Sequence, residues 1–161
     1  MSGRYLPDPS SGVQQYDQTG LVRLRRDGFG GMAATGGGPA LVTTRPLVWD
    51  AGLGHLFVNF AGTGLQAQVL NATTLQPLPG LTFDDCAAFS GDSTRRAVSW
   101  PTRLLAVAGR PVVLQFRFTT GLLYSFWLAA TPCGASRGYL AAGGPESTGG
   151  VDVHGSCSPQ H

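Results

Sequence analysis

The sequence predicts an all-β fold, an antiparallel β-sandwich of the jelly-roll type. Apolar and polar residues alternate in short runs, as they do in strands that have one buried face. These runs return about every ten residues with turn-forming residues between them, a spacing typical of sandwiches and barrels. No long segment shows the apolar period of a helix.

The chain of 161 residues has the length of one domain. Hydrophobic residues make up 42% of it, which is enough for a buried core, and the 24 glycines and 11 prolines supply many turns. We expect the sandwich to cover residues 20–130. Residues 1–19 are polar and rich in turn residues, so we expect a linker or leader there. Residues 131–161 lack an apolar period and are expected to be a flexible, disordered tail.

The strands are predicted from the alternation of their side chains. In residues 55–60, for example, Leu56, Val58 and Phe60 share one face. Turn residues such as Pro46 mark where a strand is broken. In chain order the expected strands cover residues 21–25, 41–44, 47–49, 55–60, 65–70, 95–100, 111–118 and 122–128.

The segments between these strands are expected to be turns and loops. Residues 61–64, Ala-Gly-Thr-Gly, are predicted to join two strands as a short hairpin loop. Residues 119–121 are predicted to connect the two strands of the clearest hairpin in the chain. Residues 81–94 form a polar, acidic connection, and residues 104–109 favour a helical turn.

Composition excludes several classes of partner. The net charge is only +2, and no basic stripe with interleaved aromatic residues is present, so nucleic acid is not an expected partner. All 11 basic residues are arginine. No apolar stretch is long enough to span a membrane. The first residues lack the apolar core of a signal peptide. The compartment stays open, because the chain could be the end of a longer exported protein.

Three cysteines and one sequon bear on the compartment. Cys133 and Cys157 both lie in the expected tail and could form a disulfide in an oxidising compartment, which would leave Cys86 as a lone, buried thiol. Asn71 begins an Asn-Ala-Thr sequon, which would be glycosylated only in the secretory pathway.

Several short motifs follow one another in a distinctive order. They are residues 24–29 (Leu-Arg-Arg-Asp-Gly-Phe), 41–47 (Leu-Val-Thr-Thr-Arg-Pro-Leu), 55–59 (His-Leu-Phe-Val-Asn), 91–95 (Gly-Asp-Ser-Thr-Arg) and 121–127 (Gly-Leu-Leu-Tyr-Ser-Phe-Trp). In this order they resemble the C-terminal β-sandwich region of glycoside-hydrolase-like proteins related to the five-bladed-propeller glycosidases, the invertase and sialidase-like group. The resemblance covers about residues 20–128.

The resemblance implies an accessory sandwich without catalytic residues of its own. In such proteins a propeller precedes the sandwich and holds the catalytic acids, and this chain contains no propeller. The resemblance therefore implies that the chain belongs to, or descends from, a larger carbohydrate-active protein. The proteins that the chain resembles have no counterpart of the segment after Ala130.

Aromatic residues suggest one candidate binding surface. Trp49, Trp100, Tyr124 and Trp127 could form a platform on which sugar rings stack, or they could fill the space between the sheets. Strand alternation places Tyr124 on one face and Trp127 on the other, so we expect one of the two to be exposed.

A polar cluster gives the second candidate surface. Asp92 and Arg95 lie just before or at the start of a strand, where the guanidinium group could hold a carboxylate or a sugar hydroxyl. The alternative is an Asp–Arg pair that fixes the 81–94 connection to the sheet. For ligand binding, the candidate residues are Trp49, Asp92, Arg95, Tyr124 and Trp127.

Three functions remain open on the sequence. The first is a carbohydrate-binding accessory domain. The second is a structural domain that packs on a propeller or a partner chain. The third is a stand-alone glycosidase, for which only Asp84, Asp85 and Asp92 are available, although acids in such contexts usually cap turns. We assign no catalytic residue and expect no cofactor and no metal site.

Overall fold

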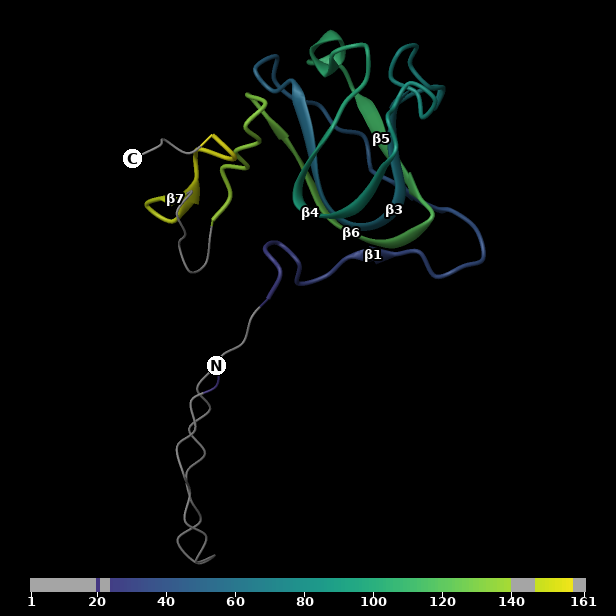
Figure 1. Ribbon diagram of the computed structural model, residues 1–161. Helices are drawn as coiled ribbons and strands as arrows, with labels where there is room; N and C mark the ends of the chain where they lie inside the picture. The colour runs from purple at the N-terminus through teal and green to yellow at the C-terminus, as the bar shows by residue number, and fades with distance from the viewer. Residues whose placement is uncertain (1–19, 21–23, 140–146, 158–161) are drawn as a thin grey trace, which may run out of the picture.

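The computed structural model describes residues 20, 24–139 and 147–157 and confirms the predicted all-β class. Its antiparallel strands form a sandwich-like arrangement that curls into a nearly closed, barrel-like shape (Figure 1). The predicted leader, residues 1–19, lies outside the described residues, as do residues 21–23 of the first predicted strand. No helix in the described ranges has the length and apolar character needed to cross a membrane.

The elements follow one another as short strands around one long strand. They are β1 (Met32–Ala33), β2 (Ala40–Thr43), β3 (His55–Asn71), β4 (Phe89–Val98), a 3-10 helix η1 (Leu104–Val107), β5 (Val112–Phe118), β6 (Thr120–Ala129), β7 (Ser147–Thr148) and β8 (Val151–Asp152). The helix η1 confirms the predicted helical turn. The polar connection is shorter than predicted, because β4 already begins at Phe89. Leu24 and Arg25, predicted to be in a strand, lie in an irregular segment instead.

Strand β3 is shared by the two layers of the sandwich. Its first half pairs with β4 on one side and β6 on the other, and its second half pairs with β5. Strand β1 extends the first layer beyond β6, and β2 extends the second layer beyond β5. Both layers therefore depend on one continuous strand that bends from one into the other.

The two predicted hairpins are wrong, because residues 61–64 continue β3, and residues 119–121 lead from β5 into β6 without reversing the chain. Strands β5 and β6 follow one another along β3 and do not pair with each other. Gly62 and Gly121 are cross-strand partners at the bend, with φ of +156° and +104°. A Cβ on Gly62 would collide with the Thr120 carbonyl oxygen. Glycine at both positions lets the two paired strands bend together. In the sequence, the same glycines look like those of a hairpin turn.

A β-bulge explains the side-chain directions in β6. Asn59 pairs with Ser125, but the next residue of β3, Phe60, pairs with Leu123, so Tyr124 is the extra residue. The bulge moves Tyr124 out of simple alternation with Phe126. Phe126 packs on the core, whereas Tyr124 lies under the Arg25 guanidinium, 4.7 Å from its ring centroid.

The core lies between the two layers. Leu56, Val58 and Phe60 from the first half of β3 face Leu114 and Phe116 of β5, and all five side chains are almost fully buried. Phe60 also contacts Phe118 edge to face, with their ring centroids 5.4 Å apart. The predicted inward faces of these strands are therefore confirmed, and this packing fixes the positions of the strand ends that carry the candidate sites.

The described part of the predicted tail contains defined contacts. Cys133 and Cys157 form a disulfide, and β7 and β8 form a small hairpin beside the barrel (Figure 1). Trp127 of β6 donates a hydrogen bond to the Gly134 carbonyl oxygen, at 3.1 Å, and stacks on Phe57. Residues 130–139 and 147–157 thus pack on the outer face of the first layer; residues 140–146 and 158–161 lie outside the described ones.

Candidate functional site

The residues predicted to form an aromatic platform do not lie together on an open surface. Trp49 is 6% exposed and belongs to the core. Tyr124 and Trp127 are half-buried on the outer face of the first layer, where the Arg25 side chain covers one and Gly134 contacts the other. Trp100, named with them in the sequence, lies elsewhere and is half-buried.

Asp92 and Arg95 both form ion pairs, but with different partners. Asp92 on β4 accepts a hydrogen bond from Arg25 at 2.5 Å, and Arg25 also donates to Asn59 at 2.6 Å. Asn59 is completely buried and donates to the Arg26 carbonyl oxygen. These contacts hold the segment that precedes β1 on the sheet. Asp92 therefore fixes the segment before β1 to the sheet, whereas the sequence suggested that an Asp–Arg pair would fix the 81–94 connection.

Arg95 contributes to what we call the Asp152 cluster, formed by Asp152, Arg26, Arg95 and Ser136. Asp152 is completely buried, and its carboxylate lies 2.6 Å from Arg26 and 3.5 Å from Arg95. Burial alone would raise the pKa of Asp152. Hydrogen bonds from the Ser136 backbone N–H, Arg26 and the Gly155 backbone N–H outweigh this effect and lower the pKa to about 2. The cluster joins both ends of the described chain to β4.

The three acids available for glycoside hydrolysis do not converge. Asp84 is 98% exposed, and Asp85 accepts hydrogen bonds from the Thr82 backbone N–H and hydroxyl. These bonds, the side-chain bond first, lower the pKa of Asp85. Asp92 is engaged with Arg25. The described residues contain no group of three or more His, Cys, Asp or Glu side chains placed to hold a metal ion.

Cys86 and Asn71 have local structural contacts. The Cys86 thiol is buried and accepts a hydrogen bond from the Ala67 backbone N–H. Burial raises the pKa of this thiol. The Asn71 side-chain oxygen accepts hydrogen bonds from the backbone N–H groups of Thr73 and Thr74, and so forms an Asx turn where β3 ends.

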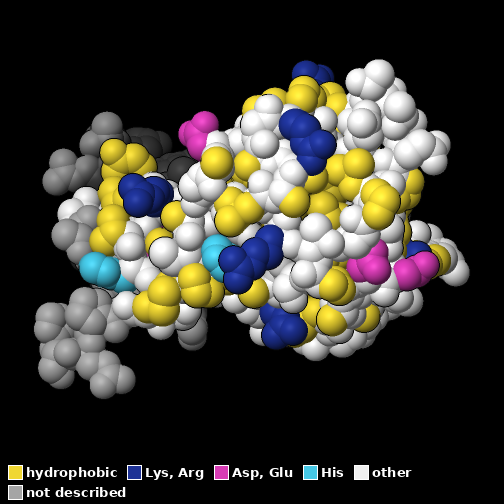
Figure 2. Space-filling view, turned by 90° about the horizontal axis from the view of Figure 1, so that it is seen from above, with side chains coloured by type: hydrophobic (Ala, Val, Ile, Leu, Met, Phe, Trp, Pro, Cys, Tyr) yellow, Lys and Arg dark blue, Asp and Glu magenta, His cyan; other side chains and the backbone are white. Residues whose placement is uncertain are grey.

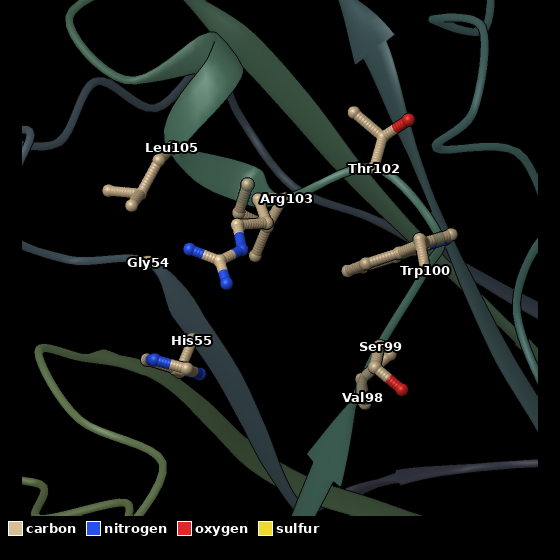
Figure 3. A pocket seen from close by; sticks show the side chains of 9 residues that line it. Gly54, His55, Val98, Ser99, Trp100, Thr102, Arg103 and Leu105 are labelled. Atoms are coloured by element: carbon tan, nitrogen blue, oxygen red, sulfur yellow. The ribbon is translucent and has the colours of Figure 1, made fainter.

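A pocket lies at the end of the barrel where β3 begins and β4 ends. Because these strands are antiparallel neighbours, His55 and Ser99 come to the same edge, and η1 places Arg103 and Leu105 opposite them. The pocket has a volume of about 280 Å³. Figure 3 shows the Arg103 guanidinium pointing toward the His55 ring, with Trp100 on the other side of the hollow.

The residues that line the pocket differ in burial and in hydrogen bonding. The Trp100 ring packs on the core, and its Nε1 donates to the Ala67 and Thr82 carbonyl oxygens at 3.0 and 3.2 Å. His55, Ser99 and Arg103 are exposed. Figure 2, which looks onto this end of the barrel, shows arginine and histidine side chains beside one another among hydrophobic ones. A hydrogen-bonded aromatic wall thus faces exposed polar groups.

Sequence reasoning missed this pocket. Trp100 was a candidate only as part of a platform with other aromatic residues, and His55 was named only within the 55–59 motif. Arg103 gave no signal. The segment Ser99-Trp100-Pro101-Thr102-Arg103 combines an aromatic and a basic residue at a strand end, but only the pairing of β3 with β4 brings it to His55.

No family model matches the sequence, and neither a curated protein nor a solved structure matches it.

Proposed function

We propose that this chain is a non-catalytic accessory domain that binds a carbohydrate in the pocket at the end of the barrel. One observation carries the proposal: a half-buried tryptophan, Trp100, forms one wall of a hollow whose other walls bear polar side chains. Carbohydrate sites combine these two features, because a sugar ring has an apolar face and a rim of hydroxyl groups.

The size and stiffness of the pocket support a sugar ligand. A volume of about 280 Å³ is at the lower limit for small-molecule sites, and it suits the end of a glycan better than a long polymer. The two hydrogen bonds to Trp100 fix the ring before a ligand arrives. A fixed ring reduces the entropy lost on binding.

The positions of the acids support a non-catalytic role. Hydrolysis of a glycosidic bond usually requires two carboxyl groups on either side of the bond. Among the described residues that line the pocket there is neither Asp nor Glu. Asp84 is exposed elsewhere, and Asp85 and Asp92 are engaged by Thr82 and Arg25. The resemblance to glycoside-hydrolase-like proteins agrees with an accessory role of this kind.

Closing the pocket should remove binding. We expect the purified chain to bind a subset of oligosaccharides on a glycan array, with dissociation constants confirmed by calorimetry for the strongest ligand. Ser99→Phe enlarges a lining residue at the rim of the hollow and should leave the Trp100 hydrogen bonds, which involve Ala67 and Thr82, intact, so we expect binding to fall about tenfold or more.

The matched control is Thr94→Phe, the same kind of enlargement at an exposed position of β4 outside the pocket. This variant should bind as the wild type does. A folded wild-type chain that binds no glycan, or that binds equally well after Ser99→Phe, would contradict the proposed function.

A second candidate function is packing on a partner, and exposed apolar side chains favour it. Leu24 and Phe29, in the segment that leads into β1, and Met32, at the start of β1, are 58%, 85% and 59% exposed. The resemblance places a neighbouring domain next to this segment. Large apolar side chains that gather on a surface often mark such a contact.

This second function predicts weak self-association of the isolated chain, because a second copy can cover the apolar segment. Sedimentation at increasing protein concentration should show dimers, and Phe29→Ser should reduce them. A chain that stays monomeric at high concentration, or that dimerises equally well after the substitution, would argue against packing through this segment. Leu75→Ser, at an exposed apolar position in another loop, is the control.

A further inference from the structure

We infer that the ligand of the pocket is an acidic sugar, whose charged group is bound by Arg103 while its ring lies on Trp100. The inference rests on the proposed function and specifies the class of sugar.

The described residues that line the pocket carry positive charge and no negative charge. They include the cationic Arg103 and the imidazole of His55, and among the described lining residues there is no acid to balance them. A cation without a nearby carboxylate attracts an anion into the hollow, most strongly at low ionic strength. A neutral sugar can accept hydrogen bonds from these groups but gains less from the charge than an anion does.

Arg103 also has its hydrogen-bond donors available. Within the part of the chain that the structure describes, no hydrogen bond or ion pair joins its guanidinium to another residue. Arg25 and Arg117, in contrast, are held by Asp92 and Gln66. Five N–H donors in a planar arrangement can bind both oxygens of one carboxylate. Arg103 can therefore serve a ligand without breaking a contact of the fold.

The positions of the side chains suit a ring with an acidic substituent. Trp100 lies across the hollow from His55, and the Arg103 guanidinium lies on the His55 side and points toward its ring (Figure 3). A sugar ring against Trp100 would have its edge toward Arg103 and His55. The imidazole offers an N–H donor in either protonation state. A hexuronate, which has a carboxylate at the edge of its ring, matches this arrangement.

A pair of simple sugars tests the inference, because methyl glucuronide and methyl glucoside differ only in the carboxylate. We expect NMR titration of the full chain to show that the glucuronide binds about tenfold more tightly. Arg103→Gln should abolish this preference. Arg45→Gln, which removes one exposed positive charge outside the pocket, should leave it intact. A sulfated glucose tests whether another anion is accepted in place of the carboxylate.

The outcomes separate this inference from the proposed function. Preference for the glucuronide or the sulfated sugar, lost in Arg103→Gln and kept in Arg45→Gln, supports it. Equal binding of acidic and neutral sugars overturns the inference and leaves carbohydrate binding standing. A preference that survives Arg103→Gln also overturns it. If neither these sugars nor any glycan on the array binds to the folded chain, both proposals fail.

Discussion

Replacing Gly121 with alanine is expected to destabilise the fold strongly. A Cβ at this position would collide with the Ala61 carbonyl oxygen and the Gly62 Cα atom across the ladder, and the φ of +104° is strained for any side chain. Because backbone atoms of two paired strands cannot move apart without breaking the ladder, we expect a cost above about 3 kcal/mol. Urea unfolding monitored by circular dichroism measures it, together with the soluble yield.

The control for this substitution is Gly36→Ala. Nothing lies within 4 Å of a Cβ built at Gly36, so this change should alter the free energy of unfolding by less than about 0.5 kcal/mol. A well-folded Gly121→Ala variant that loses less than about 1 kcal/mol would show that the bend tolerates a side chain. The shared bend of β3 and its neighbours would then need another explanation.

Asp152→Asn is expected to destabilise the protein by about 2–4 kcal/mol. The substitution keeps the shape of the side chain but removes the charge that faces Arg26 and Arg95, whose side chains are only 23% and 12% exposed. Leaving buried cations without their carboxylate is costly. Urea unfolding at neutral pH gives the difference, and Asp84→Asn, at a carboxylate that is 98% exposed, should have little effect.

The same carboxylate makes stability depend on pH. The pKa of Asp152 is lowered from 3.8 to about 2 in the folded protein, so its contribution is present above pH 4. It is lost as the pH falls from about 4 to about 2, because the unfolded chain takes up the proton first. We expect this loss to be about 2 kcal/mol in the wild type. The Asp152→Asn protein should lack this part of the pH dependence; equal acid sensitivity in both would contradict the assignment.

The sequence predicted the fold class because burial on one face of a strand leaves an alternating pattern that needs no tertiary information. Val58 and Leu114 were placed correctly in this way. The bend was not predictable, since glycines in a hairpin loop and glycines in a bent ladder give the same local pattern. Only the pairing of Gly62 with Gly121 distinguishes them.

The candidate site also depends on tertiary contacts that a local sequence pattern does not contain. Trp49 and Tyr124 were chosen for their chemistry, but a bulge and the core packing decide where such rings lie. Arg103 was not chosen, because an arginine in a loop has no local mark that tells whether it lines a pocket. The Asp152 cluster joins residues more than a hundred positions apart, a relation that no local pattern records.

The role of β3 as the partner of three strands has a consequence for synthesis of the chain. β3 ends at Asn71, but the strands that cover its free side are complete only at Ala129. At the usual ribosomal rates of about 5–20 residues per second, this delay lasts about 3–12 seconds. During that time β4 can pair with one edge of an apolar strand whose other edge is still open. Until β5 and β6 have been synthesised, this open edge can pair with other chains.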